Sequence, residues 1–220
     1  MLFLLGSVSK RVRPSAGEPK TYVNRLGLQK GLTPLETEPK LLNFPFRDPC
    51  FLENAVMARR LILMRHAKSD WANHSLSDHD RPLNERGRRA APMMAKHFLE
   101  NNLAPNVVLA STAVRVRETL ALMLAEWRYE PVVFYEQSLY LASVETLKAH
   151  VRGLHDSWTD AMILGHNPGM TDFVSWLGSQ SLEMPTAGVA VFASNEDSWH
   201  GIAARNLRLS AHWCPRDLTD

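Results

Sequence analysis

The sequence has 220 residues, of which 45% are hydrophobic and 22% are charged, and its formal net charge is +2 at pH 7. This composition is typical of a soluble globular protein, and the near balance of charge argues against a nucleic-acid-binding protein. No stretch is apolar for long enough to span a membrane or to act as a secretory signal. The two cysteines, Cys50 and Cys214, form no CxxC pair, so we expect no disulfide framework and a cytoplasmic location.

Residues 1–56 are rich in proline and show no sustained helical or strand periodicity. We predict a disordered or loosely packed extension there and one folded domain over residues 57–220. Met57 is also a candidate start of translation, because the first strand-like run follows directly after it. Basic residues at 10–13 hint at organelle targeting, but nearby acidic residues and the lack of an amphipathic pattern argue against it.

Apolar runs bounded by turn residues predict strands in the folded part. In chain order, these runs are Leu61–Met64, Val107–Ala110, Val132–Tyr135, Ala161–Leu164, Val189–Phe192 and Leu207–Ala211.

Residues at helical spacing fill the gaps between several of these strands. Three helical stripes are Ala91, Met94, Ala95, Phe98 and Leu99; Val144, Leu147, Val151 and Leu154; and Met170, Phe173, Val174 and Leu177. Pro92 lies within the first stripe and should start or kink that helix. Strands that alternate with helices predict a three-layer α/β/α fold with a mainly parallel central sheet.

Charged side chains follow two of the predicted strands. In "LILMRHAKSDW" the apolar run ends in Arg65 and His66, and in "AMILGHNPGM" His166 follows another run. A guanidinium and two imidazoles at strand ends need polar partners. Ligands of parallel α/β sheets bind beyond the carboxyl ends of the strands, so these side chains should meet at one site.

Two further stretches supply arginines to the same edge of the sheet. In "VVLASTAVRVRETL", Ser111 and Thr112 are natural N-cap residues of a helix, with Arg115 in its first turn. In "DHDRPLNERGRRA", Arg81 precedes another helix. Together with Arg65, these guanidinium groups match the oxygens of a phosphoryl group, so phosphate is the predicted ligand.

The motifs "LMRHAKS", "DRPLNERG", "STAVRVRET" and "LGHNP" occur in the order found in the histidine phosphatase superfamily. The sequence resembles most closely the SixA-like phosphohistidine phosphatase branch, also through "PTAGVAVF" and "LRLSAHWCP" near its end. The resemblance covers roughly residues 60–214. It implies a phosphoglycerate mutase-like form of the α/β/α fold.

The resemblance also implies that His66 is the nucleophile and forms a covalent phosphohistidine, with Arg65, Arg81, Arg115 and His166 around the phosphate. A neutral imidazole is nucleophilic near pH 7, and a backbone carbonyl that accepts its second N–H would aim the free nitrogen at phosphorus. Nearby arginines should lower the pKa of that imidazole, since a further positive charge is disfavoured there.

Three carboxyl groups are candidates for a general acid: Asp78, Asp80 and Glu136. Glu136 follows a predicted strand and therefore ranks first, with an exposed strand-end carboxylate as the alternative reading. SixA-like relatives lack a clear acid, which the labile P–N bond of a phosphohistidine could tolerate.

The segment between Glu136 and His166 has room for one helix and one strand but not for a capping insertion. An open site favours a phosphohistidine displayed on another protein as the substrate. Two alternatives remain, a phosphomonoesterase for small molecules or phosphopeptides and a non-catalytic regulator that only binds phosphate.

We expect no metal and no cofactor. His66, His74 and His79 lie near one another in the sequence, but their spacing is not that of a zinc site. The expected partner is a phosphorylated protein, with no nucleic acid and no membrane, and a monomer is the working expectation.

Overall fold

The computed structural model describes residues 59–218, so the predicted extension over residues 1–56 and the candidate start at Met57 lie outside the described residues. The strands are β1 (Arg59–Arg65), β2 (Val107–Ser111), β3 (Val132–Glu136), β4 (Asp160–Gly165), β5 (Val189–Ser194) and β6 (Arg208–Trp213). The α-helices are α1 (Glu85–Glu100), α2 (Val114–Glu126), α3 (Val144–Arg152) and α4 (Gly169–Gly178). Short 3-10 helices are η2 (Gln137–Leu139), η3 (Trp199–Gly201), η4 (Ala204–Asn206) and η5 (Pro215–Asp217). All the predicted strands are confirmed, five of them with slightly wider bounds, whereas β6 begins one residue later and ends two residues later than predicted.

The strands form one six-stranded sheet in the order β3-β2-β4-β1-β5-β6. Strands β3, β2, β4 and β1 run parallel, whereas β5 pairs antiparallel with both β1 and β6. The predicted mainly parallel sheet is therefore confirmed. The carboxyl ends of β1, β2 and β4 lie at one edge of this sheet. The charged residues that follow β1 and β4 in the sequence lie at the same edge.

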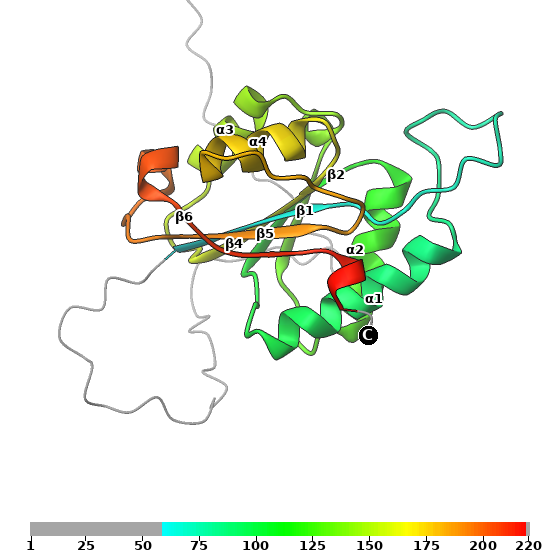
Figure 1. Cartoon of the computed structure of the whole chain (residues 1–220), viewed down its shortest axis with the longest axis horizontal. Coiled ribbons are helices and arrows are strands. Elements are labelled where there is room, and N and C mark those ends of the chain that lie inside the picture. Colours follow the sequence, from blue (N-terminus) through cyan, green and yellow to red (C-terminus); the bar gives the residue numbers. More distant parts are fainter. Residues whose placement is uncertain (1–58, 219–220) are drawn as a thin grey trace, which may run out of the picture. The chain divides into compact units, whose positions relative to one another are not determined.

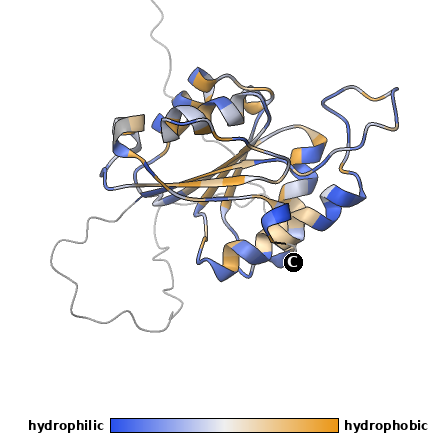
Figure 2. Ribbon diagram, in the orientation of Figure 1, coloured by the Kyte–Doolittle hydropathy of each residue, from blue (hydrophilic) through white to orange (hydrophobic). Residues whose placement is uncertain are grey.

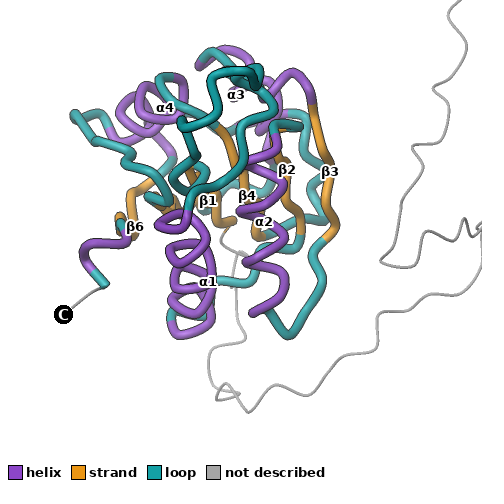
Figure 3. Tube along the Cα trace, turned by 90° about the vertical axis from the view of Figure 1, so that its right-hand side faces the viewer, coloured by secondary structure: helices purple, strands orange, loops and turns teal. Residues whose placement is uncertain are grey.

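The helices cover both faces of the sheet. Figures 1 and 3 show α3 and α4 on one face and α1 and α2 on the other. Side chains of β1 alternate between two buried clusters, with Ile62 and Met64 packed on the α1 and α2 side and Leu61 and Leu63 on the α3 and α4 side. The strands β1, β2, β4 and β5 are accordingly rich in apolar residues, as the hydropathy colours of Figure 2 show. The predicted three-layer α/β/α fold is confirmed.

Helix α1 begins where its sequence provides a cap. The side chain of Asn84 accepts a hydrogen bond from the backbone N–H of Gly87 at 2.9 Å. A Cβ at Gly87 would clash with the carbonyl of Lys68, so glycine lets the chain after β1 pass against the helix. The helix begins at Glu85, so Pro92 does not start it and is accommodated inside it.

The start of α2 differs from the prediction. Its N-cap is Ala113, which provides no capping side chain, and neither Ser111 nor Thr112 takes that position. The hydroxyl of Ser111, at the end of β2, is instead directed at His166. Arg115 does lie in the first turn of α2, as predicted.

None of the helices in the described part of the chain is long and apolar enough to cross a membrane.

Candidate active site

A pocket of about 300 Å³ lies at the carboxyl ends of the parallel strands. It is lined by Arg65, His66, Lys68, Ser69, Trp71, Asp78, Arg81, Arg115, Leu141, His166, Asn167 and Thr186. The structure therefore brings together the two histidines and three arginines that the sequence singled out. Chain segments far apart in the sequence meet here because β1, β2 and β4 are neighbours with a common direction.

His66 lies at the bottom of this pocket and is 6% exposed. Its Nδ1 lies 2.7 Å from the carbonyl oxygen of Ala67, which only accepts, so Nδ1 carries the proton. Its Nε2 accepts a hydrogen bond from Nε of Arg115 at 3.2 Å and therefore presents a lone pair. Burial lowers the pKa of His66 to about 3, with a further lowering by the charges of the three arginines and an opposing contribution from the Ala67 bond. The imidazole is neutral at pH 7, as a nucleophile requires.

His166 faces His66, with 5.0 Å between the ring centroids. Its Nε2 lies 2.8 Å from the hydroxyl of Ser111, and its Nδ1 lies 3.2 Å from a terminal nitrogen of Arg115. Burial, the neighbouring imidazole of His66 and the charge of Arg115 together lower the pKa of His166 to about 3. Arg115 thus contacts both imidazoles, and both are neutral.

Arg65 keeps most of its donors for a ligand. One terminal nitrogen donates to the carbonyl of Met184 at 2.9 Å, and its buried Nε has no partner within residues 59–218. A guanidinium carries five N–H donors, and an unpaired buried donor is costly. Burial and the neighbouring charge of Arg115 both lower the pKa of Arg65. An anion in the pocket would supply the missing acceptor and relieve this repulsion.

Arg81 is fixed from several directions at the other flank of the pocket. It donates from Nε to the carbonyl of Asp70 at 3.0 Å and from a terminal nitrogen to the hydroxyl of Ser69 at 2.6 Å. Its guanidinium also lies against the indole of Trp71, with 3.2 Å from Cζ to the ring centroid. The side chain is 7% exposed, so the positive charge is oriented and largely desolvated.

Asp78 joins the two flanks of the pocket. Its carboxylate accepts from Arg81 at 2.7 Å, from Arg115 at 2.9 Å and from the hydroxyl of Tyr140 at 2.7 Å. Burial would raise the pKa of Asp78, but the bonds from Tyr140 and Arg115 and the arginine charges together lower it. The carboxylate is therefore ionised near pH 7 and holds the guanidinium groups in place.

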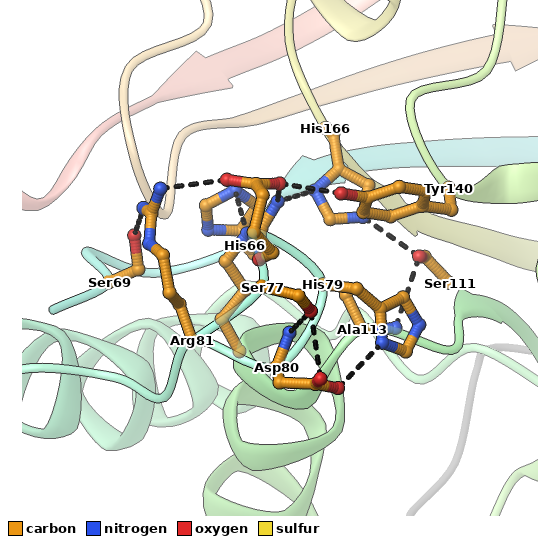
Figure 4. A network of polar contacts seen from close by, with 12 residues as sticks. His66, Ser69, Ser77, His79, Asp80, Arg81, Ser111, Ala113, Tyr140 and His166 are labelled. Atoms are coloured by element: carbon orange, nitrogen blue, oxygen red, sulfur yellow. Dashed lines mark hydrogen bonds and ion pairs between the residues drawn. The ribbon is translucent and has the colours of Figure 1, made fainter. Parts of the chain in front are cut away.

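The other two acid candidates are not among the residues that line the pocket. Glu136 ends β3, which is an outer strand of the sheet and is separated from β1 by the two strands β2 and β4. Asp80 accepts from the hydroxyl of Ser77 at 2.8 Å and lies 3.1 Å from Nδ1 of His79, and Figure 4 shows this group apart from the two pocket histidines. The ranking of Glu136 above Asp78 is thus not supported, and Asp78 is the carboxylate at the site.

Three contributing residues were not predicted as part of the site. Ser69 holds Arg81, Tyr140 holds Asp78, and Ser111 holds His166. Ser69 belongs to the "LMRHAKS" motif and could have been suspected from its place beside His66. Tyr140 carries no comparable signal, because its position depends on how the chain after β3 turns back toward the pocket.

A search of the described residues finds no group of three or more His, Cys, Asp or Glu side chains that could hold a metal ion. His74 and His79 do not line the pocket with His66. The arrangement around His66 offers positive charge, hydrogen-bond donors and one imidazole lone pair. Such a site can bind a phosphoryl group and attack its phosphorus atom.

Comparisons with known proteins agree with this geometry. The sequence profile of the histidine phosphatase superfamily (branch 1) matches residues 61–137. An uncharacterized chloroplastic protein of Arabidopsis thaliana is 34% identical over 152 residues, which are 65% of this chain and 70% of the relative. An uncharacterized protein of Mycobacterium tuberculosis is 34% identical over 150 residues, covering 68% of this chain and 89% of the relative.

Solved structures show the same fold. One is a protein of Agrobacterium tumefaciens named SixA and assigned as a phosphohistidine phosphatase, with a TM-score of 0.63 and 27% sequence identity. The superposition covers 71% of this chain and 98% of that one. The chain therefore belongs to branch 1 of the histidine phosphatase superfamily.

Proposed function

We propose that this protein is a phosphatase that removes phosphate from protein phosphohistidine through a covalent intermediate on His66. The observation that carries the proposal is the state of His66, whose Nδ1 is held by the Ala67 carbonyl while the Nε2 lone pair faces a pocket of three arginines. Family membership and the likeness to structures named SixA support the choice of reaction.

The first step is attack of His66 Nε2 on phosphorus. The new N–P bond forms as the P–N bond of the substrate breaks, and the released imidazole of the substrate takes up a proton from solvent water. A water molecule then attacks the phosphoenzyme, which releases inorganic phosphate and returns His66 to its neutral form. Both steps need an in-line approach and stabilised equatorial oxygens rather than a cofactor.

The arginines and His166 provide that stabilisation. Arg65 has unused donors at the pocket, and Arg115 and Arg81 are already oriented by their bonds to Asp78. Donors that are fixed before the reaction cost no reorganisation in the transition state. His166 completes the ring of donors once its Nδ1 carries a proton.

The state of Asp78 favours phosphohistidine over an alkyl phosphate. Its pKa is lowered, so it is a weak source of protons at neutral pH and acts mainly to hold Arg81 and Arg115. An alkoxide leaving group needs a proton from a general acid, whereas an imidazole leaves more readily. Glu136 and Asp80 do not line the pocket, so neither is our choice for that role.

The chain between Glu136 and His166 forms only η2, α3 and β4. This segment contains no inserted cap that would enclose a small metabolite. The pocket instead ends in the exposed side chains of Trp71 and Leu141. A phosphorylated side chain on the surface of another protein can reach such a site.

The test is phosphate release, without added metal, from a protein phosphorylated on histidine and from an aryl phosphate. Wild type is compared with His66→Ala and with His200→Ala, which alters an exposed histidine of η3. We expect fast release from the phosphohistidine protein, lost in His66→Ala and kept in His200→Ala.

Release from the aryl phosphate alone would contradict the phosphohistidine assignment and favour a phosphomonoesterase. Failure to release phosphate from either substrate, together with tight binding of vanadate, would favour a non-catalytic phosphate-binding regulator. Equal activity of wild type and His66→Ala would exclude His66 as the nucleophile.

A cytoplasmic location stays a prediction, because the residues that bear on it lie outside the described part of the chain. One relative is described as chloroplastic, so targeting to an organelle is the alternative to test directly. Fluorescent fusions of the full chain and of a chain that begins at Met57 should both be diffuse in the cytoplasm. Organelle accumulation of the full-length fusion alone would contradict the prediction.

A further inference from the structure

The pocket is lined by exposed apolar side chains as well as by the charged residues around His66. Two of the six large hydrophobic side chains that are exposed in residues 59–218, Trp71 and Leu141, line this pocket, with exposed fractions of 61% and 51%. Single exposed apolar residues are common on protein surfaces and need no explanation. Two such residues from separate segments at one charged pocket form a surface with a defined chemistry.

Trp71 is held in place rather than loosely exposed. One face of its indole lies over the guanidinium of Arg81, which in turn donates to the carbonyl of Asp70. The backbone N–H of Asp70 donates to the carbonyl of Pro82 at 2.8 Å, which ties the base of the projecting loop between β1 and α1 (Figure 1). The rest of the ring remains open to solvent and available to a ligand.

Leu141 has a backbone conformation that is unfavourable for a leucine. Its φ is 50°, in the left-handed region, where a residue with a Cβ carries a steric cost. The exposed side chain recovers little of this cost by burial. On one side, the hydroxyl of Tyr140 is bound to Asp78, and on the other, the carbonyl of Ala142 packs so closely on Gly169 that a Cβ there would clash. The segment is thus pinned with Leu141 at the pocket.

The two apolar side chains lie on different flanks of the site. Figure 4 shows Arg81 and Tyr140 on either side of His66. Trp71 packs on Arg81, and Leu141 directly follows Tyr140 in the chain. A phosphorylated side chain that reaches His66 therefore passes between an aromatic and an aliphatic contact.

We propose that Trp71 and Leu141 form a substrate-binding rim that selects protein segments with apolar residues next to the phosphorylated histidine. The inference rests on the proposed function. In that function the three arginines bind the phosphoryl dianion, so the rim is free to contact the residues next to the phosphorylated histidine of the substrate. A hydrophilic phosphate ester gains little from such a rim. Apolar neighbours would exclude water around the charged contact, as the central residues of protein interfaces do.

The test uses three substrates and measures kcat and KM for each. Two are synthetic peptides of equal length with one phosphohistidine, flanked by leucines in one and by serines in the other, and the third is phosphoramidate. We expect wild type to prefer the leucine peptide by about tenfold in kcat/KM, mainly through KM, in line with the loss of an interface anchor.

The informative variants are Trp71→Ala, Trp71→Phe and Leu141→Asn. Asparagine tolerates the left-handed conformation, so Leu141→Asn removes the apolar contact without added strain. Trp71→Ala and Leu141→Asn should each reduce the preference for the leucine peptide to about threefold or less, and Trp71→Phe should keep most of it. Trp176→Ala and Leu99→Asn, two exposed positions of α4 and α1 that do not line the pocket, should keep the wild-type preference.

If Trp71→Ala and Leu141→Asn keep the wild-type preference for the leucine peptide, the proposed rim does not exist. An equal loss with all three substrates would also overturn it, since Trp71 would then act only by positioning Arg81. Wild-type turnover of phosphoramidate without turnover of either peptide would overturn the rim while leaving a phosphatase that uses His66. Absence of turnover with every substrate would refute the proposed function itself, and the rim with it.

Discussion

The two histidines of the pocket follow parallel strands and contact the same arginine, but they are anchored differently. His66 donates from Nδ1 to a backbone carbonyl, which can only accept. His166 places Nε2 at the hydroxyl of Ser111, which can accept or donate. The remaining nitrogen of each ring accepts a hydrogen bond from Arg115 at 3.2 Å. One imidazole is therefore locked with its lone pair toward the pocket, and the other can exchange its tautomer.

This difference assigns the roles of the two rings. A nucleophile must keep its lone pair at the reacting atom, and the Ala67 carbonyl enforces that for His66. A donor to a phosphoryl oxygen must present an N–H where His166 now presents a lone pair. If the Ser111 hydroxyl turns to donate to Nε2, the proton of His166 can reside on Nδ1 and face the phosphoryl group. The predictions that follow test this division of labour.

The largest expected effect is the loss of the covalent intermediate in His66→Gln. Labelled phosphoramidate should leave a base-stable, acid-labile phosphate label on wild type and on His166→Gln, but not on His66→Gln. Turnover of His66→Gln should fall by about 10⁴-fold or more, because removal of a nucleophile removes the chemical route. Base-stable label on His66→Gln, or its absence from His166→Gln at long times, would reverse the assigned roles.

The next effect is a slower reaction in His166→Gln. The loss of one oriented donor to the transition state should lower kcat by about 10²- to 10³-fold. The measurement is steady-state kinetics with phosphoramidate, with His155→Gln, an exposed histidine after α3, as the control. A rise in KM with kcat unchanged would mean that His166 contributes equally to binding of the ground state and of the transition state.

Much of this site follows from local sequence patterns. The apolar runs predict the strands, and Arg65, His66 and His166 follow two of them directly, so they share one location once β1 and β4 are neighbours in a parallel sheet. Arg115 is equally accessible to prediction, because it lies in the first turn of the helix after β2. Each of these residues lies at the end of a strand or in the first turn of a helix, so the neighbouring sequence predicts its place in the fold.

The carboxylate at the site was harder to predict, because its identity depends on strand order and on the path of a long loop. Glu136 follows a strand as His66 does, but β3 is an outer strand, and the sequence does not determine that β2 and β4 separate it from β1. Asp78 lies in an exposed loop with no periodic pattern. Its position is set by bonds to Arg115 and Tyr140, which are distant in sequence.

The buried histidines should also make stability depend on pH. The pKa of each is about 3 in the folded protein, against an ordinary value of 6.5. Between these values the unfolded chain binds more protons, so the free energy of unfolding rises with pH by roughly 1.4 kcal/mol per pH unit for each histidine. This contribution is complete above about pH 6.5 and is lost progressively as the pH falls toward 3.

Urea unfolding of wild type and His166→Gln at several pH values from 4 to 7.5 measures this slope. Glutamine does not titrate, so the variant should lose about half of the combined slope of the two histidines below pH 6. An identical slope in both proteins would show that His166 is protonated in the folded state. In that case the pKa of His166 would not be lowered by folding as the pKa of His66 is.

The smallest effect concerns Ser111, which acts on the reaction through His166. Ser111→Ala removes a hydroxyl that is fully buried and should lower kcat by about tenfold, the cost of one unsatisfied buried group. Thr112→Ala removes the neighbouring hydroxyl, which contacts His79, and should change kcat by less than about twofold.

Nitrogen NMR of the imidazoles separates this positioning role from a general loss of structure. In wild type, vanadate should move the proton of His166 from Nε2 to Nδ1 while His66 keeps its proton on Nδ1. In Ser111→Ala the hydroxyl that accepts from or donates to Nε2 is gone, so the response of His166 should weaken and that of His66 should not. A change of tautomer at His66 in the same variant would mean that the Ala67 carbonyl does not lock that ring, and the contrast between the two histidines would fail.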